Sequence, residues 1–303
     1  MSEVATTSAE RPVYFPAAGE DLFGIITEPT REPKGVALVL LAGGAVPAPN
    51  RNRLSVRIAR HVAALGYHAL RLDYHGVGES TGEIDSYRLD QPYVDDLLAG
   101  VRCLEEQGVR EVALAGTCFG ARTALAAADL IPGLRGVALL APPIRDFEMG
   151  TPKIEATPTL HYAKRAFSVR WLRGLPDARR RRSYRRIART KLRAAVRSSP
   201  VHLRAPRGAA HGVSPRFSEP LARLAARGTP VLLAYGTEDE FYGPFRDARP
   251  ELAATLDVRG ARIAVRLLPG RIHTLSRLAV QDAVATLIEE WLAGLDVDPA
   301  RGP

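Results

Sequence analysis

Short runs of apolar residues alternate along the chain with longer stretches in which apolar side chains recur every three or four positions. The short runs are rich in Val, Ile and Leu and are typical of strands, whereas the periodic stretches predict amphipathic helices. The predicted strands are 13–18, 22–27, 35–41, 67–74, 112–116, 136–141, 230–235 and 263–268. The predicted helices are 53–65, 94–107, 119–130 and 275–292. This alternation is typical of an α/β fold with a mostly parallel central sheet and helices on both faces.

The alternation is interrupted once. Between 144 and 218 there is no clean strand pattern, and helical patches are mixed with prolines and a loose stretch. An insertion between two core strands is expected to form a helical cap over the C-terminal edge of the sheet. We therefore divide the chain into a first core part at 1–143, a basic helical cap at 144–218 and a second core part at 219–303.

The charge of the chain is uneven. The 303 residues have a formal net charge of +9, and positions 145–223 contain 20 Lys and Arg against 5 Asp and Glu. Two cysteines provide no disulfide framework, and the first twelve residues lack the apolar stretch of a secretory signal. The longest uncharged apolar run, 35–46, is too short to span a bilayer. We therefore expect a soluble cytoplasmic protein.

The sharpest chemical signal is the segment 116–120, Gly-Thr-Cys-Phe-Gly, where a predicted strand ends and a predicted helix begins. A nucleophile on such a turn has strained dihedral angles. The residues two positions before and after it must be small, so that strand and helix do not collide. We therefore predict that Cys118 is a nucleophile raised above the sheet edge. Cys103 lies in an apolar helical pattern and is assigned to the core.

This segment resembles the nucleophile elbow of the α/β-hydrolase superfamily, with cysteine in place of the usual serine. Dienelactone hydrolases and the bile-acid-type acyl-CoA N-acyltransferases are relatives with cysteine at this position. A second segment, 71–82, is similar to the Asp-x-x-Gly-x-Gly-x-Ser sequence after the fourth strand of that superfamily, which implies scaffold roles for Asp73 and Ser80. The resemblance covers 13–143 and 221–295, and it implies an α/β-hydrolase fold with a cap.

The same resemblance implies that a carboxylate and then a histidine follow later strands. The seventh predicted strand is followed by Gly-Thr-Glu-Asp-Glu at 236–240, in which Asp239 matches the acid and Glu238 and Glu240 are the competing carboxylates. His273 lies between the last predicted strand and the last predicted helix, where it matches the catalytic histidine. In this triad the imidazole takes the proton of the nucleophile, and the aspartate fixes its tautomer.

The chemistry of a cysteine nucleophile narrows the substrate. An unperturbed thiol has a pKa of about 8.5, and we expect the N-terminus of the helix that begins at Phe119 to stabilise the thiolate of Cys118. The predicted oxyanion donors are the N–H of Phe119 and that of Gly44 or Ala45, in the loop after the strand 35–41. Because a thiolate is a better leaving group than an amine, thioesters, esters and lactones are favoured over peptides.

The predicted cap contains a strongly basic segment, 170–197, with twelve Lys and Arg and one acid. One interpretation is a solvated cationic helix face. The other is a docking surface for the phosphates of CoA or for an acidic acyl carrier protein. Nucleic acid is not a predicted partner, because no binding motif is present and aromatic residues are few. The residues predicted to form the docking surface are Arg181, Arg182, Arg185, Arg186 and Arg189.

These observations predict a hydrolase that cleaves a small-molecule thioester, ester or lactone through an acyl intermediate on Cys118. Two alternatives stay open. One is an acyltransferase that passes the acyl group from CoA or an acyl carrier protein to an amine or alcohol. The other is a non-catalytic binding protein that keeps the fold. The sequence contains no metal-ligand spacing and no dinucleotide-binding fingerprint, so we expect neither a metal nor a cofactor.

Overall fold

The structure, a computed structural model, describes residues 8–44, 46–84, 87–146, 148–149, 212–275 and 277–296. The chain divides into two compact units. The larger unit contains Met1–Ile84, Leu89–Asp146 and Ala209–Pro303, and the smaller contains Asp85–Arg88 and Phe147–Gly208. In the smaller unit the described residues form a two-stranded antiparallel ribbon of β5 (Tyr87–Arg88) and β8 (Glu148–Met149). The predicted cap at 144–218 lies mainly outside the described residues.

The larger unit is built on an eight-stranded sheet with the order β1-β2-β4-β3-β6-β7-β9-β10. Its strands are β1 (Glu10–Ala17), β2 (Glu20–Thr27), β3 (Val36–Leu41), β4 (His68–Leu72), β6 (Glu111–Thr117), β7 (Leu134–Leu140), β9 (Val231–Gly236) and β10 (Ile263–Leu268). β1 and β2 form an antiparallel hairpin, and β2 runs antiparallel to β4. All pairs from β4 to β10 are parallel. The predicted mostly parallel sheet is therefore confirmed.

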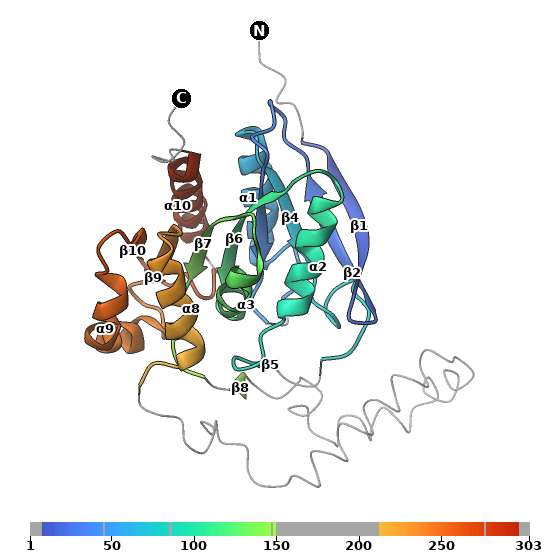
Figure 1. Ribbon diagram of the computed structural model, residues 1–303. Coiled ribbons are helices and arrows are strands. Elements are labelled where there is room, and N and C mark those ends of the chain that lie inside the picture. The colour runs from blue at the N-terminus through green and yellow to red at the C-terminus, as the bar shows by residue number, and fades with distance from the viewer. Residues whose placement is uncertain are drawn as a thin grey trace, which may run out of the picture. The chain divides into compact units, whose positions relative to one another are not determined.

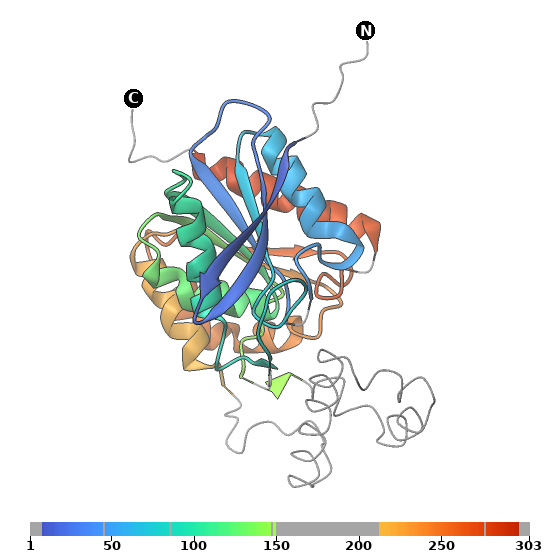
Figure 2. The ribbon, with the colours of Figure 1, turned by 90° about the vertical axis from the view of Figure 1, so that its right-hand side faces the viewer.

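Helices cover both faces of this sheet (Figures 1 and 2). They are the α-helices α1 (Leu54–Ala64), α2 (Val94–Glu105), α3 (Phe119–Ala127), α8 (Pro215–Ala226), α9 (Tyr242–Leu256) and α10 (Leu278–Asp296), with 3-10 turns at η1 (Arg51–Arg53) and η2 (Ala128–Leu130). α1 packs with α10 on one face, and α2, α3 and α8 lie side by side on the other, where α8 also contacts α9. In the described part of the chain, no helix has both the length and the apolarity needed to cross a membrane.

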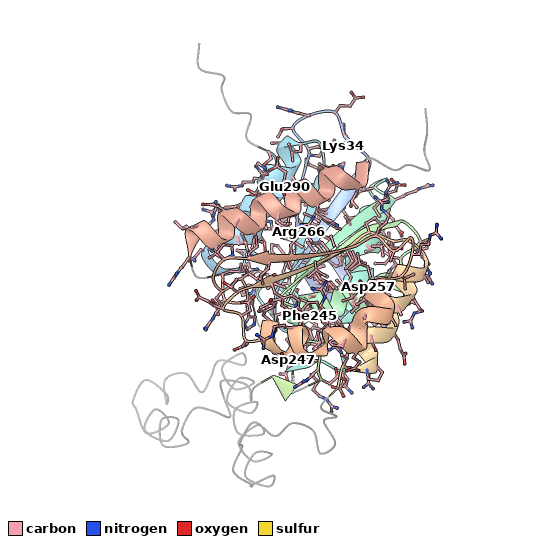
Figure 3. The ribbon with its side chains drawn as sticks, turned by 90° about the vertical axis from the view of Figure 1, so that its left-hand side faces the viewer. Lys34, Phe245, Asp247, Asp257, Arg266 and Glu290 are labelled. Atoms are coloured by element: carbon pink, nitrogen blue, oxygen red, sulfur yellow. The ribbon has the colours of Figure 1, made fainter. Side chains whose placement is uncertain are left out.

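The central strands are covered on both faces. Every residue of β3 and of β9 is buried, as continuous apolar runs predict. The edge strand β10 is only partly buried. Figure 3 shows this edge of the sheet, with Arg266 on β10 and with α9 and α10 on either side. Because the parallel strands are packed from both sides, their C-terminal ends hold the following loops along one rigid edge.

Two helices of the second core part were not predicted. α9 contains Pro244 and Pro250, which mask a helix in the sequence, although proline is tolerated in a first turn. α8 begins at Pro215, where the hydroxyl of Ser214 caps the helix by accepting a hydrogen bond from the N–H of Arg216 (3.2 Å). Core structure therefore resumes within the range that we assigned to the end of the cap.

Candidate active site

Cys118 lies on the sharp turn between β6 and α3. Its backbone has φ 53° and ψ −110°, a combination that residues with a side chain rarely adopt. Its N–H donates a hydrogen bond to the carbonyl oxygen of Leu140 on β7 (2.9 Å), which anchors the turn to the sheet. The strained turn predicted from the sequence is therefore present, and strain of this kind concentrates at functional sites.

The glycines on either side of this turn are required by close approach of the backbone. A Cβ on Gly116 would lie 2.3 Å from the carbonyl oxygen of Gly120, and a Cβ on Gly120 would lie 2.4 Å from the carbonyl oxygen of Leu41. Both neighbours are backbone atoms, which cannot move aside without shifting a strand or a helix. The ends of β3 and β6 and the start of α3 can meet at Cys118 only because these positions have no side chain.

The thiol of Cys118 is buried, with 4% of the residue exposed. Burial raises the pKa of the thiol to about 12, because the thiolate would lose its hydration. The N–H of Phe119 lowers the pKa, but it is outweighed, and the carboxylates of Glu240 and Asp239 raise it further. The stabilisation that we expected from the helix N-terminus is therefore outweighed by burial, which favours the neutral thiol.

The predicted acid and histidine follow β9 and β10. Cys118 follows β6, and all three strands are parallel, so the three loops lie at the same edge of the sheet. Asp239 is buried, and the neighbouring Glu238 is exposed. The ring of Phe241 packs edge-on against the imidazole of His273, with 4.7 Å between the ring centroids. The fold therefore gathers at one edge the residues that the sequence places far apart.

Two carboxylates contact different parts of His273. The Oδ1 atom of Asp239 accepts a hydrogen bond from the backbone N–H of His273 (2.8 Å), and its Oδ2 atom accepts one from the N–H of Gly236 (2.6 Å). The Nδ1 atom of the imidazole lies 3.2 Å from Oε1 of Glu240, whose side chain is largely exposed. Asp239 thus joins the β9 and β10 loops through backbone groups, while the longer Glu240 side chain reaches the ring.

Two backbone segments lie beside Cys118, the start of α3 and the loop after β3. Phe119 is the first residue of α3, and a hydrogen bond from its N–H to the thiol lowers the pKa of Cys118. Gly43 follows β3 on the other side, and a Cβ there would lie 3.7 Å from Cβ of Cys118. Gly44 comes next, with φ 21°, and Ala45 lies outside the described residues. The second predicted donor, Gly44 or Ala45, stays a prediction.

An aromatic cluster behind Phe119 was not predicted from the sequence. The rings of Tyr93 and Phe119 have centroids 4.8 Å apart, and the ring of Tyr74 packs against both, at 5.3 and 6.1 Å. His75 packs on Tyr93 at 4.5 Å, and its Nδ1 lies 2.8 Å from Oδ2 of Asp96. This hydrogen bond raises the pKa of His75. The loop after β4, the start of α2 and the start of α3 meet here, and no local sequence pattern predicts this meeting.

Asp73 and Ser80 bind backbone groups. The carboxylate of Asp73 accepts hydrogen bonds from the N–H groups of Ala48 and Glu79 (2.5 and 3.1 Å). The hydroxyl of Ser80 donates to the carbonyl oxygen of Asp73 and accepts from the N–H of Phe23, both at 2.8 Å. These bonds tie the loop after β3 and the loop after β4 to the sheet, as the predicted scaffold roles require.

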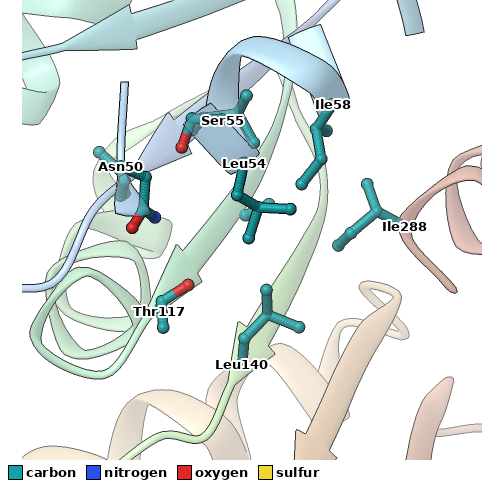
Figure 4. A pocket seen from close by; sticks show the side chains of 10 residues that line it. Asn50, Leu54, Ser55, Ile58, Thr117, Leu140 and Ile288 are labelled. Carbon is teal, nitrogen blue, oxygen red and sulfur yellow. The ribbon is translucent and has the colours of Figure 1, made fainter. Parts of the chain in front are cut away.

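A small cavity lies next to the elbow, between β3, β6, β7, α1 and α10 (Figure 4). Asn50, Ser55 and Thr117 contribute polar side chains to its wall, and the rest is apolar. Its volume of about 10 Å³ is enough for one water molecule at most. The cavity is therefore too small to hold the acyl group of a substrate.

Two further predictions concern metal binding and the basic docking surface. Among the residues that the structure describes, no group of three or more His, Cys, Asp or Glu side chains is arranged to hold a metal ion. The proposed docking surface falls outside the described residues, so it stays a prediction. Its residues are Arg181, Arg182, Arg185, Arg186 and Arg189.

Comparisons with known proteins agree with this architecture. The model of a family described as serine aminopeptidase, S33, matches residues 37–276, from β3 to the loop that carries His273. No curated protein matches the sequence.

Three solved structures are similar over nearly the whole chain. The esterase Pf2001 of Pyrococcus furiosus has 14% identity and a TM-score of 0.55, with 94% of this chain and 93% of that chain covered. The proline iminopeptidase of Mycobacterium smegmatis has 18% identity and a TM-score of 0.53, with 94% and 100% covered. The haloalkane dehalogenase DatA of Agrobacterium tumefaciens has 19% identity and a TM-score of 0.59, with 95% and 97% covered. At these identities the likeness establishes the fold.

Proposed function

Because the chain belongs to the serine aminopeptidase (S33) family of α/β-hydrolase enzymes, we propose that it cleaves a thioester, ester or lactone through an acyl intermediate on Cys118. The observation that supports this proposal is the strained turn with φ 53°, on which a cysteine stands in a family named for serine. Strain at a buried thiol beside a histidine loop is expected of a nucleophile, whereas a cysteine that only fills the core needs no such conformation.

The raised pKa of Cys118 favours the neutral thiol, so in the proposed mechanism His273 accepts its proton while sulfur forms a bond to the carbonyl carbon. The N–H of Phe119 then stabilises the oxyanion. Collapse of this intermediate breaks the bond to the leaving thiol or alcohol, which takes the proton from the imidazolium. Water, activated by the same imidazole, finally hydrolyses the acyl-cysteine and restores the thiol.

Sulfur favours activated acyl substrates over peptides. An intermediate formed from an amide expels the thiolate more readily than the amine, so it returns to substrate, whereas exchange with a thioester is nearly thermoneutral. The burial of Cys118 also bears on the acceptor. A site that limits access of water favours transfer to an amine or alcohol, so an acyltransferase is the second candidate function.

The proposed partners follow from the charge of the predicted cap. Its arginines suit the phosphates of CoA or an acidic acyl carrier protein that presents a thioester. We expect turnover of carrier-bound thioesters to fall with rising salt more steeply than turnover of small uncharged thioesters. Equal salt dependence for both substrates would remove the docking proposal. The two free thiols support a reducing compartment, and we propose a cytoplasmic location.

Trapping of the acyl intermediate tests the proposed function directly. The protein is incubated with a panel of acyl thioesters, esters, lactones and amides and analysed by intact-mass spectrometry, with peptide mapping of any adduct. We expect an acyl mass on Cys118, absent in Cys118→Ala and retained in the matched control Cys103→Ala. Addition of an amine then separates hydrolysis from transfer by the ratio of free acid to conjugate. Turnover that survives in Cys118→Ala would reject the proposal.

A further inference from the structure

Two neighbouring carboxylates approach His273 from the same loop. The acid expected from the sequence, Asp239, bonds to the backbone N–H of His273, and the next residue, Glu240, lies 3.2 Å from Nδ1 of its ring. Because Nδ1 is the atom through which a carboxylate holds an imidazole in the tautomer needed for proton transfer, the contact at this atom decides which acid positions the base.

The contacts of Asp239 are those of a residue that organises loops. Asp239 is 6% exposed. Its two carboxylate oxygens accept hydrogen bonds from the N–H of Gly236 at the end of β9 and from the N–H of His273 after β10. The two loops are also pressed together, since a Cβ on Gly236 would lie 2.2 Å from the carbonyl oxygen of Gly270. Removal of the charge of Asp239 would weaken both backbone bonds and release the loop that carries the histidine.

The contacts of Glu240 are those of a residue that acts on the ring. Its carboxylate faces Nδ1 of His273, and among the nearby charges it is the largest contributor to the raised pKa of Cys118, ahead of Asp239. The charge of Glu240 is therefore felt at both ends of the proposed proton transfer. Its side chain is 62% exposed, so solvent and salt screen the interaction.

We propose that Glu240 is the positioning residue that holds the imidazole of His273, while Asp239 holds the backbone of the histidine loop. The proposal rests on the proposed function, in which His273 takes the proton of Cys118. Because Glu240 is exposed, its effect is that of a screened ion pair, about two- to fivefold at low salt. The loop contacts of Asp239 affect the fold itself.

The test compares Glu240→Gln with Asp239→Asn, and Glu238→Gln serves as the matched control because its side chain is exposed in the same loop. The titration midpoint of His273 is followed by NMR on histidine-labelled protein, assigned with His273→Ala. This readout does not depend on any substrate. We expect Glu240→Gln to lower the midpoint by about 0.3–0.7 pH unit, equivalent to two- to fivefold, with an unchanged Tm. We expect Asp239→Asn to lower the Tm.

Kinetics with the substrate that acylates Cys118 provide the second readout. Glu240→Gln is expected to lower kcat about two- to fivefold at low salt with little change in KM, and wild type should approach the variant at high salt. If Glu240→Gln matches Glu238→Gln in midpoint, kcat and salt dependence, the inference is wrong. The same holds if Asp239→Asn shifts the midpoint at unchanged Tm. A shifted midpoint in a protein without acyl transfer would support the inference and reject the proposed function.

Discussion

Replacement of Cys103 by alanine leaves Cys118 as the only cysteine of the chain, so the reaction of this variant with a small disulfide reports the ionisation of one thiol. Burial raises the pKa of Cys118 to about 12. At pH 8 about one such thiol in 10⁴ is ionised, compared with about one in four for an unperturbed cysteine with a pKa of about 8.5. The reactive fraction is therefore about 2,000-fold smaller than in an unfolded peptide.

The nucleophilicity of the thiolate partly offsets the small ionised fraction. A thiolate of higher pKa is the stronger nucleophile, and its rate constant rises with a Brønsted slope of about 0.4–0.5. Over the difference of about 3.5 pKa units this gain is about 25- to 55-fold, so the expected net rate at pH 8 is about 40- to 100-fold below that of the peptide. Limited access to the buried sulfur lowers the rate further.

The assay follows release of thiopyridone from 2,2′-dithiodipyridine between pH 6 and pH 10, with an unstructured cysteine peptide as the reference. We expect the rate for Cys118 to rise about tenfold per pH unit over the whole range, because its pKa of about 12 lies above it. The peptide should level off above its own pKa. A fast, pH-independent reaction down to pH 6 that is lost in His273→Ala would show a resting thiolate–imidazolium pair and refute the reasoning.

Three further predictions follow from the packing. Gly120→Ala places a Cβ 2.4 Å from a backbone oxygen and should lower the free energy of unfolding by about 2–3 kcal/mol in urea titration, whereas the control Gly294→Ala, on α10 with open space around it, should not destabilise. Arg122→Met removes a buried guanidinium that bonds to Asp146 and to the carbonyl oxygens of Pro143 and Leu89. Because Asp146 keeps Ser214 and Arg216 as partners, the loss should be about 1–3 kcal/mol in the same assay, from the two carbonyl oxygens left without a donor; no loss would contradict this. Asp96→Asn removes the carboxylate charge whose hydrogen bond raises the pKa of His75. Since the raised pKa of His75 adds stability only while His75 is protonated, the variant should lose more unfolding free energy below pH 6.5 than at pH 8.5. A loss that grows as the pH rises would contradict this prediction.

The fold was largely predictable because its strands bury both faces. β3 and β9 are continuous apolar runs. Each lies between a glycine-containing turn and a helical pattern, so a buried strand is the structure that it predicts. α9 was missed for an equally physical reason. Pro244 and Pro250 interrupt its pattern, and its first turn tolerates a proline that a sequence reading treats as a break.

The elbow was predictable from the sequence, because the glycines around Cys118 stand where backbone contacts exclude a side chain. Asp239 and His273 each follow a parallel strand, as expected, but their catalytic roles stay a prediction. Whether Asp239 or Glu240 contacts the imidazole depends on side-chain length and rotamer in the loop after β9. The sequence pattern specifies neither. The burial that raises the pKa of the thiol likewise depends in part on segments distant in sequence, such as the end of β3, which packs against the elbow.

A thiol that is neutral at rest makes different demands on its surroundings from an exposed thiolate. In the proposed mechanism its proton leaves as sulfur bonds to carbon, so the rate would depend on the position of the imidazole at that moment. We infer that the hydrogen bond from the backbone N–H of His273 to Asp239 and the contact of its ring with Glu240 set this position. The same burial disfavours the thiolate and is expected to slow oxidation of the sulfur. Cys118 is therefore expected to need its histidine as completely as a serine hydroxyl would, while sulfur makes exchange with thioesters nearly thermoneutral.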